Sequence, residues 1–171
     1  MRSRHVHLSH NGAQQSHGDR PGGGAGERRP RRRDPARERH VLALAVAPRP
    51  EALVPMRRDA RVFLQGFGVP ENVVSDVIMS LQEACKNAIR FAHSKRDIDV
   101  ILAVDADAIQ LVVHDHGVGF APTIRTEAPR TPPDPLTQHG RGLFLMGALM
   151  DDVQIVRDHG AVVIMRRSLR R

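Results

Sequence analysis

Apolar residues recur along the chain with two different periods, and the two periods separate helices from strands. A stripe at three- and four-residue spacing runs through 71–92 and predicts an amphipathic helix, and further helices are expected over 51–67 and 142–150. Short apolar runs rich in β-branched residues predict strands. These runs lie at 41–47, 97–104, 108–113, 153–156 and 162–165.

The order of the predicted elements indicates the fold class. It reads β, α, α, β, β, long loop, α, β, β. Strands that follow one another as hairpins, with the helices in separate blocks, favour an α+β two-layer sandwich over a doubly wound parallel sheet. We therefore expect one such domain over 41–171.

The first forty residues differ in composition from the rest. They hold ten arginines and four acidic residues, whereas 41–171 hold 16 basic and 15 acidic residues. The tail has almost no large apolar side chains, so burial cannot offset the entropy cost of ordering it, and we predict that 1–40 are disordered. The tail is either a solvated extension, which we favour, or an arm for nucleic acid.

Composition also bears on the compartment and on other classes of partner. The single cysteine, Cys85, excludes an internal disulfide, and it lies in the apolar helical stripe as a small buried hydrophobe would. No apolar run approaches the roughly 18 residues that a membrane span requires. The aromatic residues on which nucleic-acid readers stack bases are scarce. We expect a cytoplasmic protein without a membrane anchor and without direct nucleic-acid binding.

Two polar residues on the long predicted helix are candidates for chemistry. Glu83 and Asn87 lie one turn apart, on a face away from the apolar stripe. They could be two solvated side chains, but Asn is a poor residue for a helix interior. An Asn oxygen can bind Mg²⁺, whose other ligands are largely waters and phosphate oxygens, and a Glu can accept the proton of a nucleophilic hydroxyl.

The segment HDHGVGF (114–120) follows a predicted strand. It places Asp115 at the strand end, where a carboxylate can accept a hydrogen bond from an exocyclic amino group. Gly117 and Gly119 permit a close approach of backbone or ligand. Taken alone, the segment could equally be an Asp-x-Gly turn.

A second glycine-containing segment, GRGL (140–143), precedes the last predicted helix. Gly140 and Gly142 free backbone N–H groups for phosphate, and Arg141 adds a positive charge, although a flexible connection is the simpler explanation. Between the two segments, 117–140 contain five prolines and no sustained periodicity. Loops this long within a compact domain are usually lids, binding loops or disordered.

Four histidines, His114, His116, His139 and His159, raise the question of a metal site. They have no cysteine partner and contain no pair at i, i+4 spacing, so the pattern favours ordinary structural histidines. We predict no zinc site.

Three segments in this order, EACKNAI (83–89), DHGVGF (115–120) and GRGL (140–143), resemble the N, G1 and G2 boxes of the GHKL (Bergerat-fold) ATPase and kinase superfamily. Within it, the chain is similar to the bacterial anti-sigma-factor serine/threonine kinases. The resemblance covers about 41–168. It implies a Bergerat sandwich whose mixed, mostly antiparallel sheet is covered on one face by helices.

The resemblance also implies roles for the polar candidates. Asn87 would bind the Mg²⁺ that bridges the ATP phosphates, Glu83 would be the general base, and Asp115 would bind the adenine amino group. Arg141 is a candidate phosphate contact.

The resemblance assigns the glycines to the same nucleotide site. Gly117 and Gly119 would form part of the pocket, and Gly140 and Gly142 would contact the phosphates at the hinge of a lid formed by 120–139.

The function implied is an ATP- and Mg²⁺-dependent regulatory kinase. It would transfer the γ-phosphoryl group to a Ser or Thr of an antagonist protein and would sequester a sigma factor. The alternative is a catalytically weak, nucleotide-responsive protein-binding module. Homodimerisation is left open.

The chain departs from the superfamily pattern at two places that matter for this function. Several relatives carry an arginine just before the last glycines, where this chain has Gln138 and His139. The last hairpin usually begins Gly-Thr and here begins Gly160-Ala161, which removes a hydroxyl worth about 1 kcal/mol as a net hydrogen bond. Loss of the phosphate contact would threaten catalysis more than affinity.

Overall fold

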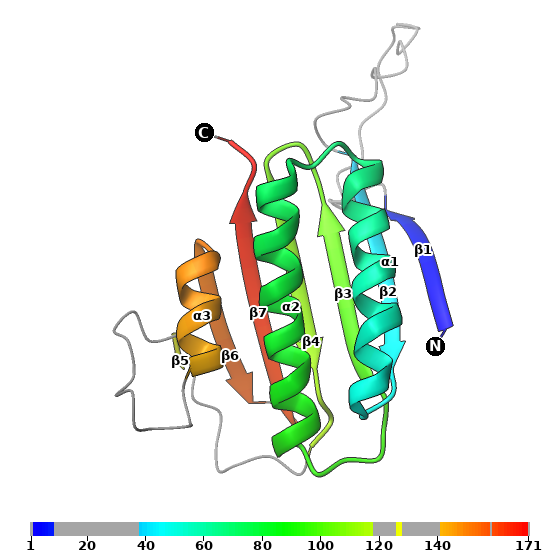
Figure 1. Ribbon diagram of the computed structural model, residues 1–171, viewed down its shortest axis with the longest axis vertical. Helices are drawn as coiled ribbons and strands as arrows, with labels where there is room; N and C mark the ends of the chain where they lie inside the picture. The colour runs from blue at the N-terminus through cyan, green and yellow to red at the C-terminus, as the bar shows by residue number, and fades with distance from the viewer. Residues whose placement is uncertain (1, 9–37, 118–125, 128–140, 158, 171) are drawn as a thin grey trace, which may run out of the picture.

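The computed structural model describes residues 2–8, 38–117, 126–127, 141–157 and 159–170. Their strands form one sheet with the order β1-β2-β3-β4-β7-β6-β5 (Figure 1). The strands are β1 (Arg2–Leu8), β2 (Arg39–Val46), β3 (Ile98–Val104), β4 (Ala108–His114), β5 (Thr126–Glu127), β6 (Asp152–Arg157) and β7 (Ala161–Ser168). The helices are the short 3₁₀ turn η2 (Pro50–Ala52), α1 (Leu53–Gly66), α2 (Glu71–Phe91) and α3 (Arg141–Leu149).

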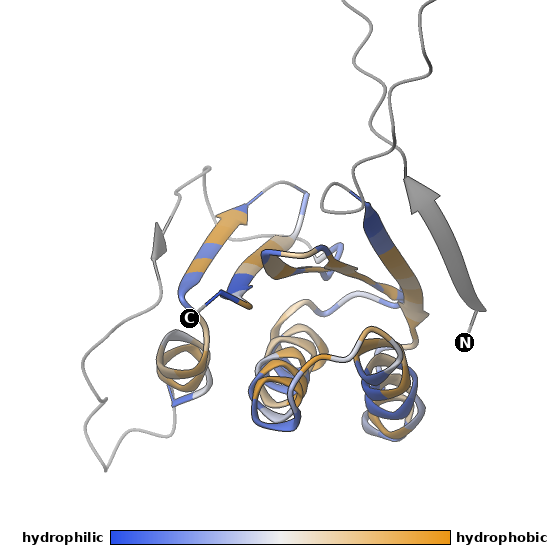
Figure 2. Ribbon diagram, turned by 90° about the horizontal axis from the view of Figure 1, so that it is seen from above, coloured by the Kyte–Doolittle hydropathy of each residue, from blue (hydrophilic) through white to orange (hydrophobic). Residues whose placement is uncertain are grey.

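The molecule has two layers. Figure 2 shows α1, α2 and α3 side by side on the same side of the sheet. The helix-free face carries exposed residues of β3, Asp99 and Ile101, between the buried Ile98, Val100 and Leu102. The α+β two-layer sandwich predicted from the order of the elements is confirmed.

The sheet differs from expectation in one respect: every pairing between described strands is antiparallel, where a mixed sheet was expected. The two α-helices α1 and α2 lie between β2 and β3 in sequence. The chain therefore reverses direction at three connections, and β2 and β3 run in opposite directions. Of the described elements, β5 and α3 lie between β4 and β6 in sequence, and β4 and β6 run in the same direction. They are not neighbours, however, because β7 lies between them and pairs antiparallel with both.

Helix α2 forms because one of its faces is apolar, and that face is the one buried against the sheet. Its buried residues are Val73, Val74, Val77, Ile78, Ser80, Leu81, Ala84, Cys85 and Ala88. Burial raises the pKa of the Cys85 thiol to about 12, so the thiol stays protonated at neutral pH, as expected of a packing residue.

Short connections fix how α1 and α2 lie. Gly68, two residues after the end of α1, adopts a positive φ of 69°, a conformation that L-residues rarely take, and Pro70 precedes the first residue of α2. At the other side of α2, Arg167 on β7 bonds to Asp76 at 3.1 Å and to Asp151 at 3.2 Å. These contacts connect α2 to the β6–β7 half of the sheet.

The amino-terminal tail departs from prediction where the structure describes it. Residues 2–8 form β1, which pairs with β2 from Arg2↔Ala45 to Leu8↔Arg39, although 1–40 were expected to be disordered. The expectation rested on the lack of apolar side chains, whereas an edge strand is held by main-chain hydrogen bonds that any sequence without proline can make. Residues 9–37 lie outside the described residues, as does the predicted lid 120–139 apart from β5.

In the described part of the chain, none of the helices has the length and apolar character needed to cross a membrane.

We predict that Leu81→Ala destabilises the fold by about 2–5 kcal/mol, because Leu81 is completely buried in the α2–sheet core and its loss leaves a cavity. Met79→Ala on the same helix is the matched control. Met79 is 48% exposed, so the free energy of unfolding should change by no more than about 0.5 kcal/mol. Urea unfolding followed by circular dichroism measures both, and equal effects would contradict the packing described.

Candidate nucleotide-binding site

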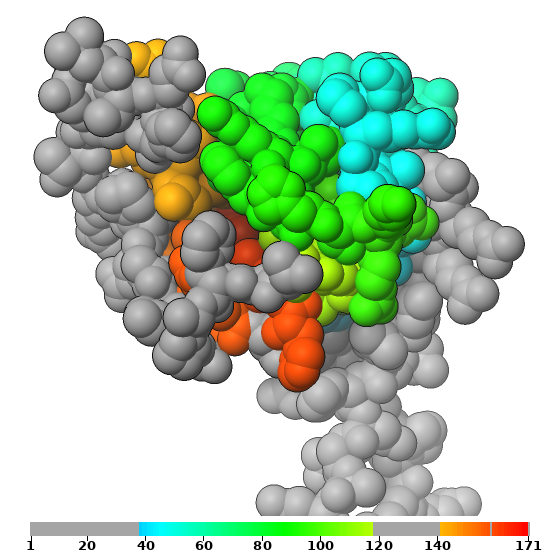
Figure 3. Space-filling model, turned by 90° about the horizontal axis from the view of Figure 1, so that it is seen from below, coloured from blue at the N-terminus to red at the C-terminus, as the bar shows by residue number. Residues whose placement is uncertain are grey.

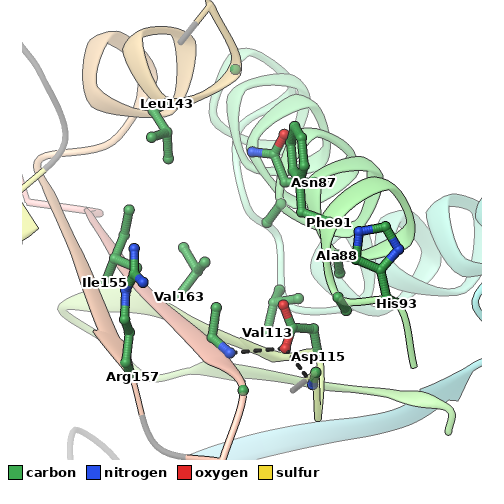
Figure 4. Close-up of a pocket in the computed structure, with 16 residues that line it drawn as sticks. Asn87, Ala88, Phe91, His93, Val113, Asp115, Leu143, Ile155, Arg157 and Val163 are labelled. Atoms are coloured by element: carbon green, nitrogen blue, oxygen red, sulfur yellow. Dashed lines mark hydrogen bonds between the residues drawn. The ribbon is translucent and has the colours of Figure 1, made fainter. Parts of the chain in front are cut away.

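A cavity of about 390 Å³ lies between the helix layer and the sheet, bounded by α2, α3 and strands β4, β6 and β7 (Figure 4). Pockets for small molecules and cofactors usually measure about 300–1,000 Å³, so the volume suits a small molecule or cofactor. In Figure 3, α2 and the residues after it (green) meet the β6–β7 segment (orange-red) at this end of the molecule.

Asp115 lies in the cavity wall, at the end of β4, and only 8% of it is exposed. Its Oδ1 accepts hydrogen bonds from the backbone N–H of Gly117 at 2.9 Å and of Ala161 at 2.8 Å. Both bonds end on the same oxygen, and Figure 4 shows the other carboxylate oxygen turned toward the cavity. The fold thus presents one anchored acceptor to a ligand.

Two positions around this carboxylate must be glycine, because the backbone there comes too close to neighbouring atoms to leave room for a Cβ. A Cβ on Gly160, whose φ is 131°, would lie 2.7 Å from Asp115 Oδ1 and 2.8 Å from the nitrogen of Gly117. A Cβ on Gly117 would lie 2.7 Å from the carbonyl oxygen of Ala92, just after α2. Real Cβ atoms do not come this close, so both positions exclude any side chain. The sequence identified Gly117 as a pocket residue, whereas Gly160 was named only as the start of the last hairpin.

Helices α2 and α3 bring the other predicted residues together. A Cβ on Gly142 would lie 3.2 Å from Glu83 Oε2 and 3.4 Å from Asn87 Nδ2, so the start of α3 packs directly on these two side chains. Asn87 and Gly142 both line the cavity. Among the described residues, the Asn87 amide has no hydrogen-bond partner, which leaves its oxygen available to a ligand.

Glu83 lies beside the cavity rather than in its wall. Its side chain is 22% exposed, and Oε1 accepts a hydrogen bond from Lys86 Nζ at 2.8 Å. Arg141 is the first residue of α3 and is exposed. Gly119 and Gly140 lie outside the described residues, so the structure does not place them.

The cavity also has wall residues that sequence reasoning did not select. Ile155 and Arg157 on β6 line it together, as residues two apart on one strand share a face. Phe91 and His93 line it from the end of α2, and His93 has a positive φ of 50°. The alternation of side chains along a strand could have indicated Arg157, because it places Arg157 on the same face as Ile155. The position of the His93 side chain depends on the positive φ of its backbone, which the sequence does not indicate.

Fold and site together define a two-layer α+β domain with a nucleotide-sized cavity between its helices and the carboxylate-bearing end of its sheet. The family model of the histidine kinase-like ATPase domain matches residues 46–167, and the chain belongs to this family. The resemblance to the GHKL superfamily is confirmed.

Individual proteins and one solved structure are also similar to this chain. The chain is 30% identical over 112 residues to the serine-protein kinase RsbW of Bacillus mycoides (strain KBAB4), covering 61% of this chain and 70% of that one. The identity and coverage are the same for RsbW of Bacillus cereus (strain Q1). The fold is similar to the crystal structure of the RsbU and RsbW domains of Rv1364c from Mycobacterium tuberculosis, with TM-score 0.57 and 18% identity over 77% of this chain and 33% of that chain.

We predict that Gly160→Ala lowers the free energy of unfolding by about 2 kcal/mol or more, because the new Cβ strains a positive-φ residue and displaces Asp115 Oδ1. Gly66→Ala, at the end of α1, is the control: nothing lies within 4 Å of its Cβ, and the change should stay within about 1 kcal/mol. Denaturant titration of both variants measures the change in the free energy of unfolding. A Gly160 variant as stable as wild type would contradict the junction described.

Proposed function

We propose that this chain is a regulatory serine/threonine kinase of the anti-sigma-factor type. It would bind Mg-ATP in the cavity, phosphorylate a Ser or Thr of an antagonist protein, and sequester a sigma factor. The observation that carries the proposal is the cavity itself, with the Asp115 carboxylate at one end and Asn87 beside Gly142 at the other. The similarity to the RsbW serine-protein kinases supports the reaction class.

The residues of the cavity fit ATP with Mg²⁺. The free oxygen of Asp115 would accept a hydrogen bond from the adenine amino group, and the apolar side chains of Val113 and Val163 would contact the ring. Asn87 would supply a neutral oxygen to Mg²⁺, whose remaining ligands are waters and phosphate oxygens. The N–H groups at the start of α3 would bind phosphate, favoured by the helix dipole.

Phosphoryl transfer requires little covalent chemistry from the protein, so its contribution is positioning and proton acceptance. Bound Mg-ATP supplies the γ-phosphoryl group and the electrophilic phosphorus. Glu83 would accept the proton of the substrate hydroxyl, since it packs against Gly142 next to the proposed phosphate site. Its pairing with Lys86 occupies Oε1 and leaves Oε2 for this role.

A second candidate is a nucleotide-responsive binding module without kinase activity. Two observations favour it: Glu83 does not line the cavity, and Ala161 provides no hydroxyl beside Asp115. In this case nucleotide binding alone would change the affinity for a protein partner.

We predict that Asp115→Asn changes base selectivity. Wild type should prefer ATP to inosine triphosphate, which carries a carbonyl in place of the adenine amino group. The variant turns an amide N–H toward the base, so ATP should bind about tenfold more weakly or worse, and the preference should shrink or reverse. Titration calorimetry with both nucleotides measures the effect; an unchanged preference would contradict the assignment of Asp115.

The same titrations test the metal ligand. Asn87→Ala should abolish the strengthening of ATP binding by Mg²⁺ while leaving metal-free ATP binding near the wild-type value, because only the proposed metal contact is removed. Phe91→Ala, which alters the cavity wall without touching a proposed metal ligand, is the control and should retain the Mg²⁺ dependence. Equal Mg²⁺ dependence in Asn87→Ala and wild type would refute the role of Asn87.

We predict that Glu83→Gln slows phosphoryl transfer by about 10²–10⁴-fold, the usual contribution of a general base, with ATP affinity little changed. The assay uses the full chain, γ-labelled ATP, Mg²⁺ and candidate antagonist proteins, and it detects label on Ser or Thr. Lys86→Met is the control, since it removes the ion-pair partner and keeps the carboxylate. If wild type binds ATP and labels no antagonist, the binding-module function replaces the kinase.

A further inference from the structure

Two histidines and an aspartate meet on the sheet face opposite the nucleotide cavity. Asp99 on β3 pairs directly with His114 on β4, so their side chains project from the same face. His116 follows two residues later, and its Nε2 lies 2.6 Å from Asp99 Oδ2. The two imidazole rings have centroids 3.9 Å apart. Asp115, between them in sequence, serves the cavity on the other face.

The three residues form a set with ligand geometry. One ligand atom from each lies within 4.8 Å of the other two. His114 Nε2 is buried and, among the described residues, has no hydrogen-bond partner, an unfavourable state for a ring nitrogen unless a ligand compensates it. His116 is held in place at a positive φ of 51°, with 12% of its side chain exposed, while Asp99 is 56% exposed and leaves the cluster accessible.

We propose that Asp99, His114 and His116 bind a divalent transition metal such as Zn²⁺ or Co²⁺. Two imidazoles and one carboxylate are a ligand set that such ions take with a fourth position left to water, whereas Mg²⁺ and Ca²⁺ prefer oxygen ligands throughout. Metal–ligand bonds of about 2.0–2.1 Å place tetrahedral ligand atoms about 3.3 Å apart. The Asp99–His116 hydrogen bond therefore has to open by only about 0.7 Å to admit the ion.

This proposal departs from the sequence prediction of no zinc site, which rested on the lack of a cysteine partner and of an i, i+4 histidine pair. On a strand the matching spacing is i, i+2, and the third ligand comes from the paired strand, 15 residues earlier in sequence than His114. The site is separate from the proposed Mg²⁺ position at Asn87, and it does not depend on the proposed kinase activity.

The test is titration of the full chain with Co²⁺, followed by its visible absorption, with Zn²⁺ added afterwards as competitor. We expect one equivalent to bind with tetrahedral-type absorption that Zn²⁺ abolishes. His116→Gln and Asp99→Asn should each weaken Co²⁺ binding by about tenfold or more, since even outer-shell changes at metal sites cost about 10–100-fold. Metal should also raise the thermal midpoint of wild type, and at the same metal concentration it should raise that of Asp99→Asn by less.

A second histidine pair in the chain supplies the control. His5 and His7 on β1 also have i, i+2 spacing, so the double variant His5→Gln/His7→Gln should bind Co²⁺ like wild type. Circular dichroism checks that each variant is folded, and Asp99→Asn alters a side chain that is 56% exposed. No cobalt absorption in wild type, unchanged affinity in Asp99→Asn and His116→Gln, or loss of binding in the His5/His7 variant would each overturn the proposal.

Discussion

One oxygen atom, Oδ1 of Asp115, holds together the part of the molecule on which the site depends. It accepts the N–H of Gly117, where β4 ends, and of Ala161, where β7 begins. The bond from Gly117 is buried and the bond from Ala161 is partly buried, and hydrogen bonds removed from water are electrostatically stronger than those at the surface. The ends of two central strands are therefore fixed together, and the second oxygen of the carboxylate faces the cavity.

Around this junction, backbone packing leaves no room for side chains. Gly160 lies against Asp115, and Gly117 lies against the carbonyl of Ala92, so the end of α2, the end of β4 and the start of β7 touch through main-chain atoms. Helix α2 carries Asn87 into the cavity little more than one turn before this contact. The carboxylate and amide sides of the cavity are thus set by the same close approach.

The sequence predicted those parts of the fold that depend on local periodicity. Helix α2 and the β3–β4 hairpin follow from one-sided burial. Motif order predicted that Asn87 and Asp115 lie together, and both line the same cavity. Sheet order could not be predicted in this way, because the insertion of β7 between β4 and β6 depends on pairing between distant segments. The strand β1 was missed because main-chain pairing leaves no compositional signal, and His93 because its position depends on a positive φ.

The end of β4 assigns consecutive residues to opposite faces. His114 and His116 project beside Asp99 on the helix-free face, while Asp115 projects into the cavity. Because the backbone of these three residues is continuous, a ligand that restrains the histidines restrains the carboxylate as well. If occupation of one face changes affinity on the other, linkage requires the effect to be equal in both directions. Any such coupling would act through the backbone of residues 114–116, which connects the two faces.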